Sequence, residues 1–170
     1  MATRLLFVCL GNICRSPSAE NIMNYLIEQR QLTDQISCDS AGTASYHIGS
    51  APDRRMNTAA QRKGITLVGS ARQFDVEDFE KFDLILAADR SNYRDILALA
   101  PNRLADSASG AATVDSYAHK VKLICDYCHN HSDEEVPDPY YGGEAGFDYV
   151  IELLLDACDG LLDAVVTDSF

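Results

Sequence analysis

The sequence predicts an α/β fold: a single domain, residues 1–170, with a four-stranded, twisted parallel sheet that carries helices on both faces. Two observations lead to this class. Short apolar runs alternate along the chain with longer segments of helical periodicity, the pattern of successive strand–helix–strand units. The chain has 170 residues, 46% of them hydrophobic, and can bury one substantial core but hardly two.

Four apolar segments are predicted as strands. The first contains Leu5-Leu6-Phe7-Val8, a short aliphatic and aromatic run that leads directly into a loop. Strands that are buried on both faces of a parallel sheet have this near-continuous hydrophobic character. The predicted strands are Arg4–Cys9, Ile36–Ala41, Leu84–Ala87 and Val121–Cys125.

Helical segments follow these strands. The first is expected to begin at Pro17, because Ser16 is a residue type that caps helix N-termini and proline is favoured at the first helical position. Its apolar residues recur at helical spacing, and the last helix also has one apolar face. The predicted helices are Pro17–Gln31, Arg54–Lys63, Asn92–Ala98 and Phe147–Val166.

The loop between the first strand and the first helix is predicted to bind an anion. N–H groups at the start of a helix are unpaired and carry the positive end of its dipole, so a phosphate-like dianion can bind there. The loop lacks the Gly-Lys-Ser/Thr of a nucleotide-binding P-loop. Its residues are Cys9-Leu10-Gly11-Asn12-Ile13-Cys14-Arg15-Ser16.

Cys9 is the candidate nucleophile of this loop. A thiol among N–H dipoles and beside Arg15 is expected to have a strongly lowered pKa. Arg15 can hold two oxygens of the bound group through its planar fork. Gly11 allows a close backbone approach, and Asn12 tolerates a left-handed conformation. The competing interpretation is a buried strand-end cysteine beside a solvated arginine.

Asp138 is the candidate proton donor. A thiolate that takes a phosphoryl group needs an acid for the leaving oxygen. The segment Asp138-Pro139-Tyr140-Tyr141-Gly142-Gly143 is punctuated by proline and glycine and is predicted to be a loop. Taken alone, an Asp-Pro dipeptide is typical of an ordinary turn.

Together the two motifs strongly resemble those of the low-molecular-weight protein tyrosine phosphatases. That family has a Val-Cys-Leu-Gly-Asn-Ile-Cys-Arg-Ser-Pro loop near its N-terminus and an Asp-Pro-Tyr-Tyr loop near its C-terminus, and both occur here without a departure. The resemblance spans nearly the whole chain. Further matches are Asp39-Ser40-Ala41-Gly42-Thr43, Tyr46-His47-Ile48-Gly49, Pro52-Asp53, Ala71-Arg72-Gln73 and Asp89-Arg90-Ser91-Asn92.

The resemblance implies an enzyme that hydrolyses phosphotyrosine, and small aryl phosphates, through a phosphocysteine intermediate. Cys9 would be the nucleophile, Arg15 the clamp for the phosphoryl oxygens, and Asp138 first the acid and then the base. Further residues implied to bind substrate or to support the loop are Leu10, Gly11, Asn12, Ile13, Cys14, Ser16, Ser40, Tyr46 and Tyr140.

Within this set, Ser40 would hold Asn12, and Ser16 would bond the Cys9 sulfur. Tyr46 and Tyr140 would form the walls of a slot that stacks a phenol ring and excludes the shorter phosphoserine. Arginine and preorganised N–H groups can stabilise the charge of the transition state. No metal or cofactor is expected.

Two departures from familiar members of that family stand out. The stretch Ala105–Tyr117 is rich in small residues and is predicted to be a surface insertion, about residues 105–117. Vertebrate members carry a histidine just before the Ala-Arg-Gln segment, where this chain has Gly69.

Several cysteines invite other interpretations. Cys14 could capture an oxidised Cys9 as a disulfide, or it could be a small apolar residue under the loop. The segment Cys125-Asp126-Tyr127-Cys128-His129-Asn130-His131 has features of a haem or zinc site, but no export signal and no second cysteine pair accompanies it. Cys125 is instead expected in the last strand. The irregular spacing of all six cysteines does not suggest a secreted disulfide framework.

Three alternative functions remain open. A thioredoxin-coupled arsenate reductase would need two further cysteines in a mobile segment, which Cys125 and Cys128 could supply only if that strand end moves. Protein-arginine phosphatases carry threonine where this chain has Ile13, and the bulkier Ile13 favours an aryl phosphate. A non-catalytic phosphotyrosine-binding module is disfavoured because nucleophile, clamp and acid are all present.

Charge and hydropathy limit the partners. The net charge of −12 argues against nucleic acid, and no apolar segment reaches membrane-spanning length. The acidic clusters Asp75–Glu80 and Asp133–Glu135 are expected to be solvated. We therefore expect a cytoplasmic enzyme that acts on phosphotyrosine-containing proteins, without membrane insertion, as a monomer that could associate weakly with itself.

Overall fold

A computed structural model describes residues 2–101, 117–140 and 142–170. It confirms the predicted α/β class with a four-stranded sheet of order β2-β1-β3-β4. All three strand pairings are parallel, so the carboxyl ends of the strands meet at one edge. The strands are β1 (Thr3–Cys9), β2 (Ile36–Gly42), β3 (Leu84–Ala87) and β4 (Val121–Leu123).

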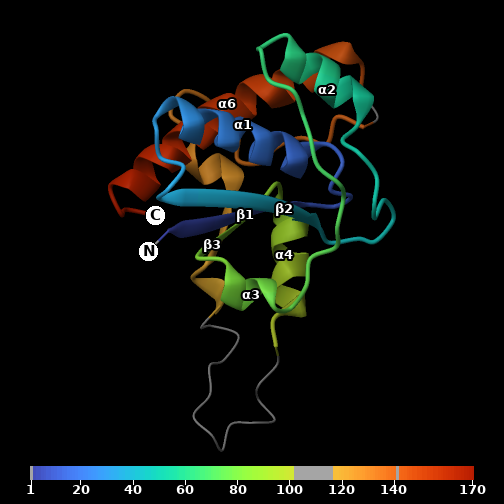
Figure 1. The fold of residues 1–170 in the computed structure, drawn as a ribbon. Helices are drawn as coiled ribbons and strands as arrows, with labels where there is room; N and C mark the ends of the chain where they lie inside the picture. Colours follow the sequence, from blue (N-terminus) through green and yellow to red (C-terminus); the bar gives the residue numbers. More distant parts are fainter. Residues whose placement is uncertain (1, 102–116, 141) are drawn as a thin grey trace, which may run out of the picture.

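Helices cover both faces of the sheet, as predicted (Figure 1). On one face lie α1 (Arg15–Gln29), α2 (Arg54–Gln61) and α6 (Glu144–Val166), and on the other lie α3 (Asp78–Lys81) and α4 (Arg90–Leu99). Alternate side chains of β1 serve the two cores: Leu5 and Phe7 pack on the α1–α6 side, whereas Leu6 and Val8 pack on the α3–α4 side.

The start of α1 differs from the prediction. The helix begins at Arg15 rather than Pro17, Cys14 occupies the N-cap position, and no side chain caps the helix. Ser16 is not the cap, because its hydroxyl is engaged with Cys9, Asn12 and the Ala41 carbonyl across the loop. The Ser16 hydroxyl, which the sequence predicts as the helix cap, therefore binds groups of the loop instead.

The end of the sheet also differs. The strand predicted to reach Cys125 stops at Leu123, where its pairing with Ala87 ends. The chain then turns into the short 3₁₀ helix η2 (Ile124–Tyr127). The Asp126 carboxylate accepts a hydrogen bond from the Leu123 N–H at 3.0 Å, which favours the turn over a longer strand. The expectation of a strand residue at Cys125 was wrong.

One predicted surface cluster is partly buried. Asp78, within the Asp75–Glu80 cluster, is 2% exposed and accepts two bonds from the Arg72 guanidinium. The short helix α3 around it was not predicted. The expected insertion at 105–117 lies outside the described residues, except for Tyr117, which is buried against Phe79. In the described part of the chain, no helix is long and apolar enough to cross a membrane.

Candidate active site

A pocket of about 280 Å³ opens at the carboxyl end of β1. Nine of its ten lining residues were predicted as site residues from the sequence. Three other predicted residues, Asn12, Ser16 and Ser40, do not line it and are buried behind the loop. The lining residues are Cys9, Leu10, Gly11, Ile13, Cys14, Arg15, Tyr46, Asp138, Tyr140 and, in addition, His47.

Cys9 is one of the residues that line this pocket. The residue is 2% exposed, and its sulfur is hydrogen-bonded to the Ser16 hydroxyl at 3.0 Å. Because α1 begins at Arg15, the positive end of its dipole lies beside the sulfur. Burial raises the pKa of the neighbouring Cys14 to about 12, and Asp53 and Cys9 add to the rise. Cys14 is therefore a neutral thiol at physiological pH.

Asn12 fixes the shape of the loop, which we call the Cys9 loop (residues 9–15). Its φ of +56° lies in the left-handed region, which asparagine tolerates. The side-chain NH₂ of Asn12 donates to the hydroxyls of Ser16 and Ser40, both at 2.9 Å. Its side-chain oxygen, Oδ1, accepts from the backbone N–H of Arg72 at 2.9 Å. The loop is braced from three segments of the chain.

The strand beside the loop must also leave room for it. A Cβ at Gly42, the last residue of β2, would lie 2.8 Å from the Leu10 carbonyl oxygen. The N–H groups of Thr43 and Ala44 donate to the carbonyls of Cys9 and Leu10, both at 2.9 Å. Glycine at this position therefore allows the loop to lie directly on the end of β2.

Arg15 is held from behind the pocket. Its guanidinium donates through Nη1 to the Asp89 carboxylate at 2.7 Å and to the Val136 carbonyl at 3.1 Å. Burial works to lower the pKa of Arg15, but the negative charges of Cys9, Asp89 and Asp138 outweigh it and raise that pKa. A buried, permanently charged guanidinium thus faces the position of an incoming anion.

Asp138 approaches from the opposite side. Its side chain is 43% exposed, and its Oδ2 lies 3.8 Å from Nη2 of Arg15. Oδ1 accepts a hydrogen bond from the Tyr140 N–H at 3.0 Å, which orients the carboxylate within its turn. The loop carrying Asp138, described at residues 128–140 and 142–143 between η2 and α6, is named the Asp138 loop below.

Two tyrosines stand at the mouth of the pocket. Tyr46 is 77% exposed, and Tyr140 is partly exposed. The Arg55 guanidinium lies over the Tyr140 ring at 5.3 Å and donates to the Tyr140 carbonyl at 3.4 Å. Arg55 of α2 therefore holds Tyr140 in place. Among the described residues, no cation lies over the ring of Tyr46.

Sequence reasoning missed three contributors to this site. His47 lines the pocket, Asp89 anchors Arg15, and Arg55 supports Tyr140. His47 and Asp89 belong to segments that match the family, but the sequence predicts no role for either residue. The signal for Asp89 is its position directly before α4, where it caps the helix by accepting from the Asn92 N–H at 2.7 Å.

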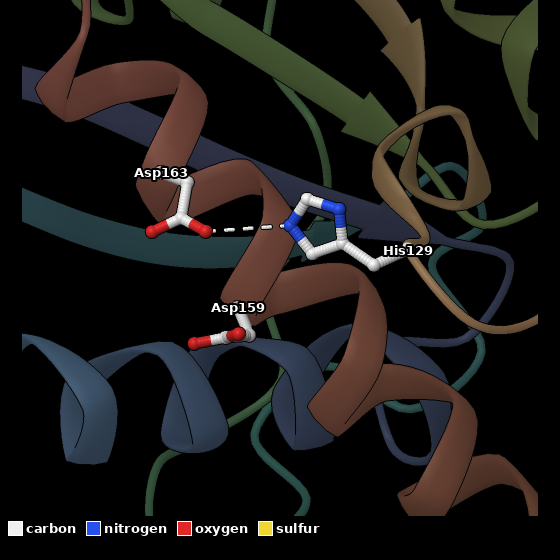
Figure 2. Close-up of side chains that lie close together, drawn as sticks. All are labelled: His129, Asp159 and Asp163. Atoms are coloured by element: carbon white, nitrogen blue, oxygen red, sulfur yellow. Dashed lines mark hydrogen bonds and ion pairs between the residues drawn. The ribbon is translucent and has the colours of Figure 1, made fainter.

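The histidines of the Cys125-to-His131 segment point to different partners. His131 Nδ1 lies 2.8 Å from Asp156, whereas His129 joins Asp159 and Asp163 on α6 (Figure 2). Among the described residues, these last three are the only group within metal-binding distance of one another. The Arg30 guanidinium pairs with both of their carboxylates, which supplies a positive charge to the cluster.

Comparison with known proteins identifies the family. The sequence model described as low molecular weight phosphotyrosine protein phosphatase matches residues 4–169. The chain belongs to this family.

Relatives and solved structures of the family align with nearly the whole length of this phosphatase. A Synechocystis sp. protein provisionally named a low molecular weight protein-tyrosine-phosphatase is 57% identical over 95% of this chain and 96% of its own length. The low molecular weight phosphotyrosine protein phosphatase of Gallus gallus is 38% identical over 94% and 93%. A crystal structure of a protein tyrosine phosphatase from Entamoeba histolytica, with Hepes in the active site, superposes with a TM-score of 0.89 at 40% identity, covering 99% of this chain and 100% of that one.

The phosphatase has an open space at Gly69. Its φ is +125°, and nothing lies within 4 Å of the place where a Cβ would be. Gly69, Glu20 and Ser40 are among the residues that line a cavity of about 70 Å³ behind the Cys9 loop. Burial raises the pKa of Glu20, which accepts a hydrogen bond from Ser40 at 2.6 Å. The Ser40 hydroxyl accepts a hydrogen bond from Asn12 and donates one to Glu20, so two successive hydrogen bonds link Glu20 to Asn12.

Proposed function

We propose that the protein hydrolyses phosphotyrosine in proteins, and small aryl phosphates, through a phosphocysteine intermediate. The observation that carries the proposal is the convergence of a buried thiol, a buried guanidinium and a partly exposed carboxyl on one pocket. These are the groups that nucleophilic phosphoryl transfer requires.

In the first step, the Cys9 sulfur attacks phosphorus while Arg15 and the N–H groups of the loop hold the phosphoryl oxygens. Asp138 gives its proton to the departing phenol oxygen, and the phosphoryl group remains on sulfur. In the second step, Asp138 takes a proton from water as that water attacks phosphorus, and Cys9 leaves as a thiolate. The Ser16 hydroxyl, 3.0 Å from the sulfur, stabilises the thiolate in both steps.

Substrate selection follows from the walls of the pocket. Tyr46 and Tyr140 stack the phenol ring, and Ile13 packs beside it. A phosphoserine side chain is too short to reach Cys9 between these walls, because the reacting sulfur is almost completely buried. The proposed substrate is therefore a phosphotyrosine-containing protein.

The proposed setting is the cytoplasm, with the protein acting as a monomer. All six cysteines are free, which is typical of proteins in a reducing compartment. An arsenate reductase relay finds little support, because neither Cys125 nor Cys128 lines the Cys9 pocket and Cys125 is only 7% exposed.

The test uses four peptides of one sequence that carry phosphotyrosine, phosphoserine, phosphothreonine or phosphoarginine. We expect release of phosphate from the phosphotyrosine peptide at least a hundredfold faster than from the others, with and without a metal chelator. Acid-quenched turnover should leave phosphate on Cys9, detectable by mass spectrometry. Equal rates on all four peptides, absence of the phosphocysteine, or faster thioredoxin-coupled reduction of arsenate would overturn the proposal.

A further inference from the structure

Cys125 and Cys128 form a pair that the proposed reaction does not use. The Cys128 N–H donates to the Cys125 carbonyl at 3.3 Å, which closes a 3₁₀-type turn at the end of η2. Residues three apart in such a turn lie on the same side, about 6 Å apart along the axis. That spacing lies within the roughly 4.4–6.8 Å between the Cα atoms of disulfide-bonded cysteines.

The two thiols also interact with each other. Cys125 and Cys128 each affect the pKa of the other, the Asp156 carboxylate also acts on Cys128, and both cysteines are in the reduced, free form. Cys38 and Cys158 have acceptors of their own: Cys38 donates to the Asn24 side chain at 3.1 Å, and Cys158 donates to the Ala19 carbonyl at 3.7 Å. Outside the Cys9 loop, Cys125 and Cys128 are the two thiols that one hydrogen-bonded turn brings together.

The backbone that carries the pair is fixed by its neighbours. The Asp156 carboxylate accepts bonds from the N–H groups of His129, Asn130 and His131, directly after Cys128. On α6, a Cβ at Gly160 would lie 1.8 Å from the Tyr127 carbonyl oxygen, so the turn packs closely on the helix. The turn that carries the two cysteines is therefore held against α6 on both sides of Cys128.

The environment of the pair affects both the rate and the stability of a disulfide. Burial raises the pKa of Cys128 to about 11, and the Asp156 carboxylate adds to the rise. Burial also raises the pKa of Cys125. Few thiolates form at neutral pH, which slows exchange, but the reduced pair also gains no stability from ionisation. A disulfide between these residues is therefore slow to form at neutral pH.

We propose that Cys125 and Cys128 form a reversible disulfide, a redox site separate from Cys9, by exchange with a low-molecular-weight disulfide such as oxidised glutathione. Cys128 is the more exposed of the two and reacts first. Its thiolate attacks glutathione disulfide, forms a mixed disulfide and releases one glutathione thiolate. The Cys125 thiolate then attacks the Cys128 sulfur and releases the second glutathione. Two electrons pass to glutathione, and the two thiol protons end on the two glutathione molecules.

The test begins with the Cys9→Ser protein, so that the loop thiol cannot react. The protein is incubated with oxidised glutathione at pH 8.5, alkylated in denaturant and digested with a protease that cleaves before aspartate. One cut falls before Asp126, between the two cysteines, and separates residues 115–125 from 126–132. We expect the two fragments to remain joined until a dithiol reductant is added.

Two variants sharpen this result. In Cys128→Ser protein, the joined fragment should disappear and Cys125 should carry the alkylating group. In Cys38→Ser protein, the matched control, the joined fragment should form to the same extent. Full alkylation of both cysteines after oxidation, a persistent glutathione adduct on Cys128, or a link to Cys38 or Cys158 would overturn the proposal. The readout is a mass, so it does not depend on the proposed phosphatase activity.

Discussion

The two loops that face the pocket are held in different ways. The Cys9 loop is closed by bonds of its own buried side chains, with Asn12 contacting Ser16, Ser40 and the Arg72 backbone. The Asp138 loop is attached on both sides of Asp138: the Val136 N–H donates to the Ala88 carbonyl at 2.8 Å, and Arg55 donates to the Tyr140 carbonyl at 3.4 Å. The nucleophile and the anion site are therefore fixed in advance, whereas the position of the acid depends on tethers in the neighbouring residues.

Substitutions in the two loops should therefore differ in the size of their effect on turnover and stability. Changes inside the Cys9 loop remove the reaction or the geometry on which it depends. Changes at the tethers of the Asp138 loop alter stability, or the placement of a side chain that is already partly exposed.

Replacing Cys9 by serine should have the largest effect. A neutral hydroxyl is a far weaker nucleophile than a thiolate, so we expect the turnover number for p-nitrophenyl phosphate to fall roughly 10⁴-fold or more. Cys38→Ser serves as the matched control and should retain wild-type turnover, because Cys38 does not line the pocket. Turnover within tenfold of wild type in Cys9→Ser protein would rule out the nucleophile assignment.

Replacing Asp138 by asparagine should remove general acid catalysis. We expect turnover to fall about 10²- to 10³-fold with phenyl phosphate, and less with p-nitrophenyl phosphate, whose leaving group needs little protonation. The comparison of the two substrates separates loss of the acid from loss of folding. Asp133→Asn, on the same loop, is the control, and an equal loss with both substrates would contradict the role of Asp138.

Replacing Asn12 by alanine should disturb the Cys9 loop without removing a reacting group. Alanine at a φ of +56° is strained by roughly 1–2 kcal/mol, and three hydrogen bonds are lost. We expect turnover to fall about 10- to 100-fold, with a lower melting temperature. Asn12→Gly relieves the strain alone, so full recovery of turnover by glycine would show that the hydrogen bonds are dispensable.

Replacing Asp156 by asparagine should weaken the attachment of the Asp138 loop. The lost charge-assisted bonds should cost roughly 1–3 kcal/mol in free energy of unfolding at pH 7. Burial works to raise the pKa of Asp156, but its bonds to His131 and the neighbouring N–H groups outweigh it and lower that pKa. The ionised group therefore stabilises the fold above the ordinary aspartate pKa, and this contribution is lost as the pH falls through the lowered value. Urea unfolding should show the wild-type advantage at pH 7 and its decline in acid; an advantage that grows in acid would contradict this.

Replacing Arg90 by glutamine should have the smallest effect. Its guanidinium pairs with Glu134 and Glu135 at the surface of the Asp138 loop. Exposed ion pairs contribute little because water and salt screen them, so we expect less than a threefold change in turnover and no measurable change above roughly 0.5 M salt. A loss comparable with that of Asp138→Asn would mean that this tether sets the position of the acid.

The sequence predicted the fold class and the residues of the pocket because both depend on short segments. The apolar run before Cys9, the helix after it and the Asp-Pro-Tyr-Tyr segment each carry their signal within about ten residues. The bond between Ser16 and the Cys9 sulfur is confirmed, but the predictions of Ser16 as the helix cap and of Cys125 as a strand residue failed because local propensity was outweighed there. The Ser16 hydroxyl has stronger partners across the loop, and the Asp126 carboxylate ends the last strand early.

By itself, the sequence determined the four strands, the four longer helices and the two loops that meet at the pocket. Only the tertiary structure decided which distant groups hold them: Asp89 behind Arg15, the Arg72 backbone beside Asn12, and Asp156 beneath the Asp138 loop. The physical reason is that periodicity and turn chemistry belong to neighbouring residues. A buried polar group instead takes the partner that the order of the sheet and the packing of helices bring within hydrogen-bonding distance.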